Sequence, residues 1–242
     1  MYKRQITNRN KGAIEDHFDH SYELEDKLKG NESKKKIYED VLACSNFGNI
    51  YFLRQKETKG LGHAVLCAKN FVGNEPFAVL YGDDVILSET PCTKQLCDAY
   101  EKYGKGVVGV KEVPGMAITK YCSLKTEPLE GNCYTCTDMI EKPKPEEIMG
   151  NFSILGRVVL PPQIFDILEN TPLGAGNELQ LTDAMKTLAQ TDGVVAVDYE
   201  GVRYDMGNKF GILQANIEVG LKHPETREEL KAYLKKLAAD LD

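Results

Sequence analysis

Long apolar runs are missing from this 242-residue sequence, and so is any excess of positive charge. No apolar stretch approaches the roughly 20 residues that a membrane-spanning helix needs. The opening residues, MYKRQITNRN, lack the apolar centre of a signal peptide. The net charge of −7 argues against nucleic acid or an anionic membrane as a partner, because both require clustered Lys and Arg. We therefore expect a cytoplasmic protein that binds neither, although a small phosphorylated ligand remains compatible with this charge.

Repeats, low-complexity tracts and flexible linkers are absent as well. Helical and strand-like patterns alternate instead, with helical spacing in 32–47, 60–72 and 90–104 and strand-like runs in 49–55, 76–82 and 106–113. This order predicts βαβ units, and hence an α/β fold with a mostly parallel sheet flanked by helices. Three more strand-like runs within 115–160 predict a β-rich insertion. Two helices, a strand and two closing helices are expected after it, the last of them over 226–241.

The seven cysteines include one CxxC pair, Cys133 and Cys136, and no second such pair. Because the pair lies in a strand-like run, its side chains should point to opposite faces, which is a poor geometry for sharing zinc. The acidic and histidine-rich segment 15–20 has the composition of a metal site, but its spacing also suits the solvated face of a short helix. We expect reduced thiols, with a zinc or redox module as an alternative.

Adjacent carboxylates, Asp83 and Asp84, follow an apolar run that ends in Gly82. A third, Asp205, follows another strand-like stretch. Ligands of open parallel sheets sit at the carboxyl ends of the strands, and Mg²⁺ usually takes only one or two protein carboxylates. Two strand-end aspartates are therefore expected to meet across a crevice and hold one Mg²⁺. The alternative is an aspartate pair in a turn that caps the next helix.

Glu141 and Lys142 end a strand-like run directly before a proline, which favours an extended Lys142. Glutamate can accept hydrogen bonds from sugar hydroxyls, and lysine can bind phosphate as a point charge.

Gly60 and Gly62 lie directly before a predicted helix, whose free N–H groups can receive polar or anionic ligands. Gln55 ends the preceding strand and offers both donors and acceptors, which suits the edge of a pyrimidine.

Taken together, the segments RQKETKGLGHAV, VLYGDDVI, DMIEKP, GAGNELQLTDAM and RYDMGNKFG resemble the bacterial UTP–glucose-1-phosphate uridylyltransferases, also called UDP-glucose pyrophosphorylases. The resemblance runs from about Arg9 to the C-terminus. It implies a Rossmann-like nucleotidyltransferase fold with a mixed central sheet, spanning 1–242 as one domain. It also implies that a phosphate oxygen of glucose 1-phosphate attacks the α-phosphorus of UTP, with Mg²⁺ as cofactor, in a homo-oligomer (dimer or tetramer).

The same resemblance assigns roles to individual residues. Asp83 and Asp205 match metal ligands, and with Lys142, which matches the lysine on the sugar phosphate, they form the expected catalytic set. Gln55 and Gly60 match uracil contacts, and Glu141 matches the carboxylate on the glucose hydroxyls. The full set expected to bind substrate is Gln55, Gly60, Gly62, Asp84, Cys122, Glu141, Lys142, Gly156 and Glu178, with Asp183 in a supporting motif.

Two departures from the family qualify these expectations. The family's opening strand and its glycine-rich phosphate loop, resembling GxGTRxxP, have no counterpart here, so we expect this chain to have little uridylyltransferase activity as written. The alternative is a non-catalytic chain that binds UDP-sugars or contributes to oligomers. Cys122 stands where the family usually has a glycine whose N–H approaches the sugar, so sugar identity stays open, as does the choice between UTP and dTTP.

Overall fold

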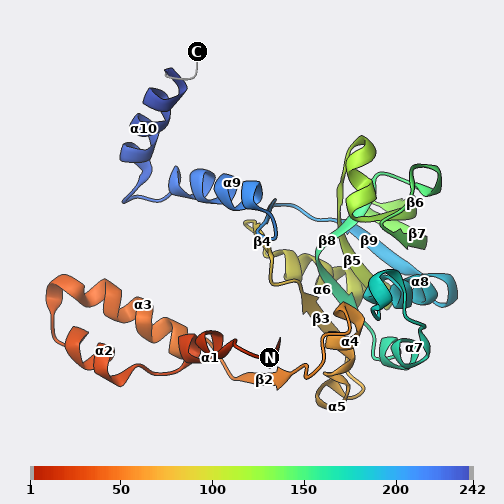
Figure 1. Cartoon of the computed structure of the whole chain (residues 1–242), viewed down its shortest axis with the longest axis horizontal. Helices are drawn as coiled ribbons and strands as arrows, with labels where there is room; N and C mark the ends of the chain where they lie inside the picture. Colours follow the sequence, from red (N-terminus) through yellow and green to blue (C-terminus); the bar gives the residue numbers. More distant parts are fainter. Residues whose placement is uncertain (1–2, 240–242) are drawn as a thin grey trace. The chain divides into compact units, whose positions relative to one another are not determined.

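Helices and strands alternate along residues 3–239, the part of the chain that the computed structural model describes (Figure 1). They form two units: the first comprises Met1–Glu75 and Pro162–Ala184, and the second comprises Pro76–Pro161 and Met185–Asp242. The expectation of one domain over 1–242 stays a prediction.

The first unit is built on two parallel strands, β1 (Lys3–Thr7) and β2 (Ile50–Arg54). Its helices are α1 (Gly12–Phe18), α2 (Tyr22–Leu28), α3 (Lys35–Ser45), α4 (Leu61–Leu66), α5 (Lys69–Val72) and α7 (Ile164–Asn170), with the short 3₁₀ turns η1 (Glu32–Lys34) and η4 (Ala175–Asn177). The sequence pattern predicts one helix over 60–72, and the chain divides it into α4 and α5. Helix α8 (Leu181–Thr191) begins in this unit and ends in the second.

A six-stranded sheet in the order β3-β8-β5-β9-β7-β6 forms the second unit. Its strands are β3 (Phe77–Leu80), β5 (Gly106–Glu112), β6 (Cys122–Glu130), β7 (Cys133–Glu141), β8 (Phe152–Leu160) and β9 (Val194–Asp198), with the 3₁₀ turns η2 (Gly115–Lys120) and η3 (Pro145–Glu147) between strands.

The expected mixed α/β architecture is confirmed, but fewer neighbouring strands are parallel than the alternating pattern suggests. Within this sheet, β5 and β9 pair in parallel, whereas the pairs β3–β8, β8–β5, β9–β7 and β7–β6 are antiparallel. The reason is that the predicted β-rich segment joins the main sheet, because β8 is apolar on both faces and is buried between β3 and β5.

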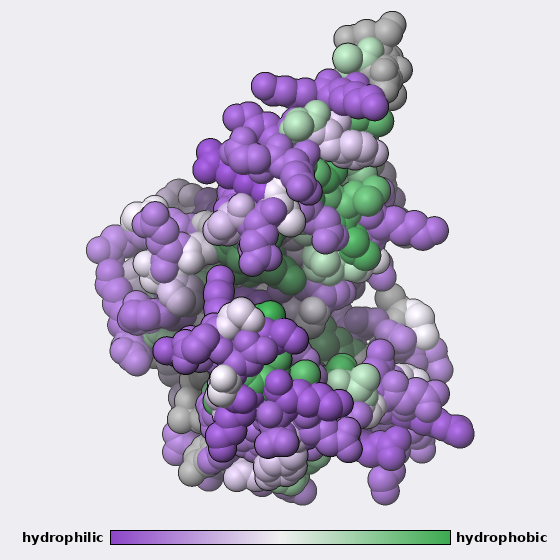
Figure 2. All heavy atoms as spheres, turned by 90° about the vertical axis from the view of Figure 1, so that its left-hand side faces the viewer, coloured by the Kyte–Doolittle hydropathy of each residue, from purple (hydrophilic) through white to green (hydrophobic). Residues whose placement is uncertain are grey.

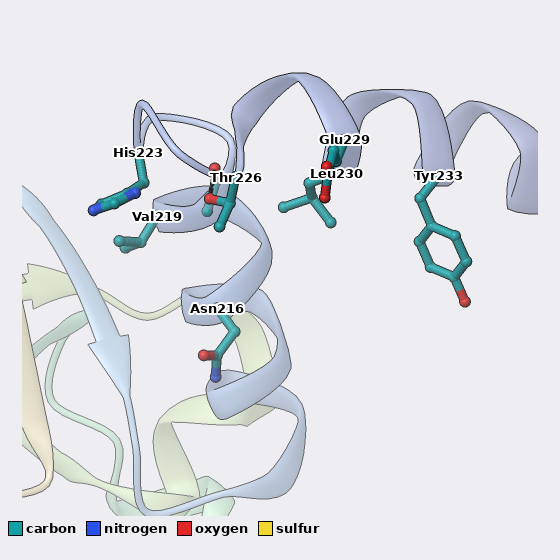
Figure 3. Close-up of a pocket in the computed structure, with 8 residues that line it drawn as sticks. Asn216, Val219, His223, Thr226, Glu229, Leu230 and Tyr233 are labelled. Carbon is teal, nitrogen blue, oxygen red and sulfur yellow. Dashed lines mark hydrogen bonds between the residues drawn. The ribbon is translucent and has the colours of Figure 1, made fainter.

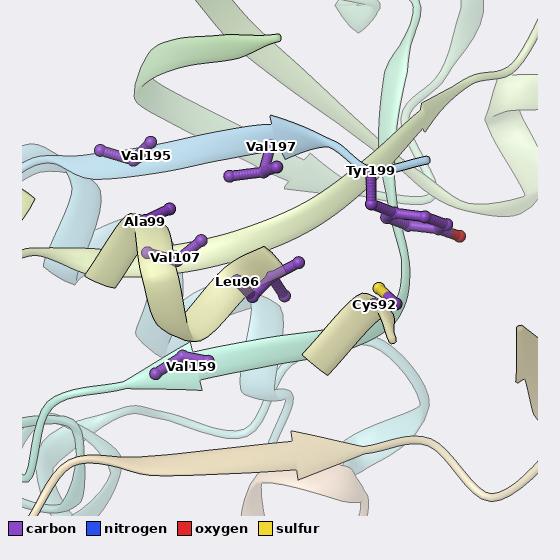
Figure 4. Packing of buried hydrophobic residues seen from close by; sticks show 8 residues of the cluster. All are labelled: Cys92, Leu96, Ala99, Val107, Val159, Val195, Val197 and Tyr199. Carbon is purple, nitrogen blue, oxygen red and sulfur yellow. The ribbon is translucent and has the colours of Figure 1, made fainter. Parts of the chain in front are cut away.

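Helix α6 (Cys92–Tyr103) covers the sheet and forms the core with it (Figure 4). Cys92, Leu96 and Ala99 lie one helical turn apart, so they share a face, and all three are buried against valines of β5, β8 and β9. The helix ends at Gly104, whose left-handed φ of +63° closes the C-terminus through an N–H that donates to the Tyr100 carbonyl. These positions agree with the helix predicted over 90–104.

A second, two-stranded sheet joins β4 (Asp84–Leu87) to β10 (Val202–Asp205) in antiparallel register. After β10 come α9 (Lys209–Gly220) and α10 (Arg227–Ala239), which agree with the two closing helices predicted, although the last two residues of the predicted helix 226–241 lie outside the described residues. Within 3–239, none of the helices combines the length and the apolar character that crossing a membrane requires.

A shallow pocket of about 630 Å³ lies between the C-terminal end of α9 and α10 (Figure 3). Its lining includes Asn216, Val219, His223, Leu230 and Tyr233. The green hydrophobic surface just below the grey C-terminal residues in Figure 2 lies over these two helices. None of the residues predicted to bind substrate or metal lines this pocket.

Candidate active site

Two carboxylates come together where β4 and β10 meet. Asp83 directly precedes β4, Asp205 ends β10, and the N–H of Met206 donates to the carbonyl of Asp83 over 2.7 Å. A methyl carbon added to Gly207 would lie 3.0 Å from Asp205 Oδ1 and 3.2 Å from Asp83 Oδ2. Both oxygens therefore border the same small volume. The structure thus places Asp83 and Asp205 side by side, and their service as metal ligands stays a prediction.

Asp84 has a different environment from Asp83. It is the direct cross-strand partner of Asp205, its side chain is buried, and its Oδ1 accepts a hydrogen bond from Nε of Arg203. Burial raises the pKa of Asp84, and the guanidinium of Arg203 acts in the opposite direction. Arg203 Nη2 also lies 3.6 Å from Asp205 Oδ2. One guanidinium thus bridges two carboxylates that would otherwise repel each other across the strands.

Gly156, one of the residues predicted to bind substrate, lies on β8 against this cluster. Its φ is +92°, and a Cβ at this position would lie 3.2 Å from Asp84 Cβ and 2.9 Å from Ile86 Cδ1. A side chain here would therefore push β4 away, so the glycine makes room for the buried aspartate.

Tyr121 connects the aspartates to the predicted sugar-phosphate lysine. Its hydroxyl donates to Asp205 Oδ2 over 3.3 Å, and its carbonyl accepts the N–H of Lys142 over 2.7 Å. The expectation of an extended Lys142 is wrong, because its φ is +46°. The preceding residue, Glu141, still ends β7 in register with Cys122, and the chain turns sharply to give Lys142 its hydrogen bond.

The side chain of Cys122, at the start of β6, is buried. Its N–H donates to Ser153 Oγ over 3.2 Å, and its Sγ accepts the N–H of Ile154 over 3.3 Å. Burial raises the pKa of the Cys122 thiol to about 11, so the sulfur is a neutral thiol at physiological pH. The N–H that the family resemblance assigns to the sugar is thus already bound to Ser153.

The remaining predicted residues form a second group, in the first unit. Gly60 precedes α4 with φ +94°, and Gly62 lies in its first turn. The N–H of Gly62 donates to the carbonyl of Leu179 over 2.9 Å, and the N–H of Leu179 donates to the backbone carbonyl of Lys59 over 2.8 Å. A Cβ on Gly60 would lie 2.8 Å from Glu178 Cβ. The two glycines therefore allow the loop to pack directly on the segment that carries Glu178, whose side chain is exposed.

Gln55 is fixed within this group by two hydrogen bonds. Its Nε2 donates to the carbonyl of Gly60 over 3.1 Å and to Nδ1 of His63 over 2.9 Å. Since an amide nitrogen can only donate, Nδ1 of His63 must be the acceptor. The acceptor of the amide, Oε1, is thereby turned away from both partners.

A divalent cation fits the aspartate cluster by charge. Asp83, Asp84 and Asp205 with Arg203 leave two net negative charges, which one divalent ion would balance. Nowhere in 3–239 do three or more His, Cys, Asp or Glu side chains gather closely enough to hold a metal by themselves. Mg²⁺ commonly uses one or two carboxylates and takes its other ligands from water and substrate phosphates.

Comparison with known proteins identifies relatives of this chain. The sequence pattern of the Nucleotidyl transferase family matches residues 16–220. The UTP–glucose-1-phosphate uridylyltransferase of Staphylococcus epidermidis is 48% identical over 232 residues, which cover 96% of this chain and 80% of that protein. The corresponding Bacillus subtilis protein is 47% identical, over 95% of this chain and 77% of its own length.

The chain belongs to the UTP–glucose-1-phosphate uridylyltransferase family. Solved structures of this nucleotidyltransferase family have the same fold. A UDP-glucose pyrophosphorylase complexed with UDP-glucose superposes with a TM-score of 0.79 at 34% identity, over 97% of this chain and 81% of the other. A UTP-bound enzyme from Acinetobacter baumannii gives 0.82 at 33% identity, over 97% and 83%. The family resemblance predicted from the sequence motifs is therefore confirmed.

Three residues that contact the predicted ones were not identified from the sequence: Arg203 and Tyr121 in the second unit, and His63 in the first. A signal existed for Arg203, because it lies two residues before Asp205 on a strand and so shares its face. His63 lies eight residues after Gln55 and one turn beyond Gly60, but nothing in the sequence specifies the hydrogen bond between them. Tyr121 meets Asp205 across 84 residues of sequence, a contact that only the fold reveals.

Proposed function

We propose that this member of the uridylyltransferase family transfers UMP from UTP to glucose 1-phosphate and so forms UDP-glucose and pyrophosphate. The substrates in the names of its relatives support this reaction. The observation that carries the proposal is the convergence of Asp83 Oδ2 and Asp205 Oδ1 on one point beside Gly207. A phosphoryl-transfer enzyme needs such a site to hold the cation that accompanies the nucleotide phosphates.

In this proposal Asp83 and Asp205 hold Mg²⁺, which when bound offsets negative charge at the phosphates. Lys142 binds the phosphate of glucose 1-phosphate, and Glu141 accepts hydrogen bonds from the glucose hydroxyls. The left-handed backbone of Lys142 supports its assignment, because strained non-glycine residues cluster at functional sites and cost about 1–3 kcal/mol each. The protein thus contributes position and charge rather than covalent chemistry.

In the first unit, Gln55 and Gly60 contact the uracil ring in this proposal. With Nε2 bound to Gly60 and His63, Gln55 offers Oε1 to the ring. Uracil carries a donor at N3, which suits this acceptor, and thymine carries the same donor. Gly62 and Glu178 support the nucleotide and sugar side of the site.

Asp84, Cys122 and Gly156 complete the proposed substrate-binding set. The buried positions of Asp84 and Cys122 favour a role in shaping the site over direct contact with the sugar. We also propose that the protein is a cytoplasmic homo-oligomer. A cytoplasmic location suits an enzyme whose substrates are a soluble nucleotide and a sugar phosphate.

The test is a pyrophosphate-release assay on the chain with UTP, glucose 1-phosphate and Mg²⁺, run beside a calorimetric measurement of UDP-glucose binding. Asp83→Asn should cut turnover by more than about tenfold, because it removes a charged metal ligand. Asp98→Asn is the matched control, because Asp98 is exposed on α6 and pairs with Lys94. Parallel reactions with dTTP and with galactose 1-phosphate identify the preferred substrates.

Each outcome separates the alternatives. Turnover that depends on Asp83 but not on Asp98 supports the proposal. UDP-glucose binding without any turnover favours the non-catalytic, sugar-nucleotide-binding alternative. A chain that neither binds UDP-glucose nor releases pyrophosphate contradicts the proposed function, and equal turnover in Asp83→Asn contradicts the metal assignment.

A further inference from the structure

We propose that Arg203 and Tyr121 are positioning residues, which together hold the Asp205 carboxylate so that its Oδ1 faces Asp83. This inference rests on the proposed function, in which these two aspartates share a divalent cation. Neither Arg203 nor Tyr121 is assigned to contact substrate or metal itself.

The register of β4 and β10 explains why Asp205 needs residues that hold its carboxylate in place. It places Asp84 directly opposite Asp205, and like charges in this position repel. Asp84 is also buried, so its charge requires a partner within the protein. Arg203 lies on the same face of β10 as Asp205, and its side chain is only 15% exposed. It is therefore close to both carboxylates and shielded from water.

Each oxygen of Asp205 has a distinct set of partners. Oδ2 accepts from the Tyr121 hydroxyl at 3.3 Å and lies 3.6 Å from Arg203 Nη2. Oδ1 accepts the N–H of Gly207 at 2.9 Å and borders the same point as Asp83 Oδ2. Both oxygens are therefore held by the protein: Oδ2 on the side of Arg203 and Tyr121, and Oδ1 on the side of Gly207 and Asp83.

Tyr121 also aligns Arg203 itself. The guanidinium carbon lies 5.6 Å from the centroid of the Tyr121 ring, within the range of a cation–π contact. The same tyrosine thus holds the arginine through its ring and the aspartate through its hydroxyl. Loss of either contact should loosen Oδ2 and leave the N–H of Gly207 as the main restraint on Oδ1, which weakens a two-carboxylate site because the carboxylate is then less well pre-positioned.

Mn²⁺ binding provides the test, because its electron paramagnetic resonance signal reports free ion without any turnover. The chain would be titrated with Mn²⁺ in the presence of saturating UDP-glucose. Tyr121→Phe removes only the hydroxyl, and Arg203→Lys keeps the charge but loses the planar fork that reaches two carboxylates. Each should weaken Mn²⁺ binding by about five- to tenfold, the effect of one lost ordinary hydrogen bond.

The matched controls are the same two substitutions, Tyr→Phe and Arg→Lys, at exposed positions away from the aspartates. Tyr103→Phe removes a hydroxyl that donates to the exposed Glu130, and Arg227→Lys alters an exposed arginine beside Glu228. Neither should change Mn²⁺ affinity. Thermal melts monitored by circular dichroism show whether each variant is folded. If Arg203→Lys does not fold, Tyr121→Phe still decides the test, because it leaves the Arg203–Asp84 pair intact.

Weaker Mn²⁺ binding in folded Tyr121→Phe, with unchanged controls, supports the inference. Equal Mn²⁺ binding by wild type and folded Tyr121→Phe overturns the positioning role and leaves the proposed function intact. If the wild-type chain binds UDP-glucose but no Mn²⁺, the metal assignment fails and the inference with it. The wild-type titration alone reveals that case.

Discussion

At the scale of single residues, His63 determines which atom Gln55 presents. Because Nε2 is bound to both Gly60 and His63, the amide atom that remains to contact a ligand is the acceptor Oε1. Uracil has an N3–H that donates to this acceptor, whereas cytosine has a bare N3 that does not. We therefore predict that His63→Ala, which frees the amide to flip, narrows the preference for UDP-glucose over CDP-glucose by about tenfold. Calorimetric titration with both nucleotides measures this ratio.

His63→Asn is the control for that prediction. The asparagine Oδ1 can occupy nearly the position of the histidine Nδ1 and accept the same hydrogen bond, so this variant should keep the preference for uracil. An unchanged ratio in His63→Ala would show that Gly60 alone fixes the amide, and would contradict the prediction.

The residues of the site differ in how far the sequence could reveal them. Asp83, Asp205 and Gln55 stand at the ends of strand-like runs, so local pattern alone selects them. Arg203 gains its role only through Asp84, which is 119 residues away in sequence and becomes its neighbour through the pairing of β4 with β10. The left-handed φ of Lys142 could not be predicted either, because the following proline favours an extended backbone and the hydrogen bond to Tyr121 overrides that preference.

At the scale of elements, the alternation of helical and strand-like patterns predicted most helices and strands. It did not predict which strands become neighbours, since pairing depends on contacts that are distant in sequence. Strand β3 illustrates the limit. Its apolar run predicts a buried strand, yet β3 lies at the edge of the six-stranded sheet, and Leu80 is 54% exposed.

The contact between the glycine loop and the segment around Leu179 leads to a prediction about stability. A Cβ at Gly62 would lie 2.7 Å from the Leu179 carbonyl oxygen and 3.0 Å from Leu168 Cδ2, so backbone must move to admit it. Gly62→Ala should therefore lower the free energy of unfolding by about 2 kcal/mol. Urea unfolding followed by circular dichroism measures the change.

Gly12→Ala is the matched substitution, because a Cβ at Gly12 meets nothing within 4 Å and the residue begins α1. This change should be neutral or should stabilise the chain by up to about 1 kcal/mol, since it restricts the unfolded chain. If both variants unfold at the same urea concentration, the close packing of the loop on Leu179 does not contribute to the free energy of unfolding, and the prediction is wrong.

At the scale of the whole molecule, α10 presents an apolar stripe that its own chain covers only in part: Leu230 and Leu234 are half-buried, and Tyr233 and Leu237 are exposed. Leu230, Tyr233, Leu234 and Leu237 follow the spacing of one helix face, yet the helix has no buried residue, and Tyr233 is 61% exposed. Such a stripe on a charged helix is typical of a surface that packs against another helix. The distribution of charge indicates which helix fits.

We predict that a second copy of this chain covers the stripe. Glu228 and Glu229 lie in the first turn of α10, and Lys235 and Lys236 lie near its end, so two copies packed antiparallel bring opposite charges together around a two-fold axis.

Size-exclusion chromatography with light scattering should then give at least twice the 27.0 kDa chain mass. Replacing Tyr233 and Leu237 by Glu places charge in the stripe and should return the chain to a monomer. Glu at Tyr22 and Leu24, which are at least as exposed on α2, should not. A wild-type monomer, or dissociation by both pairs of substitutions alike, would show that α10 is not the contact.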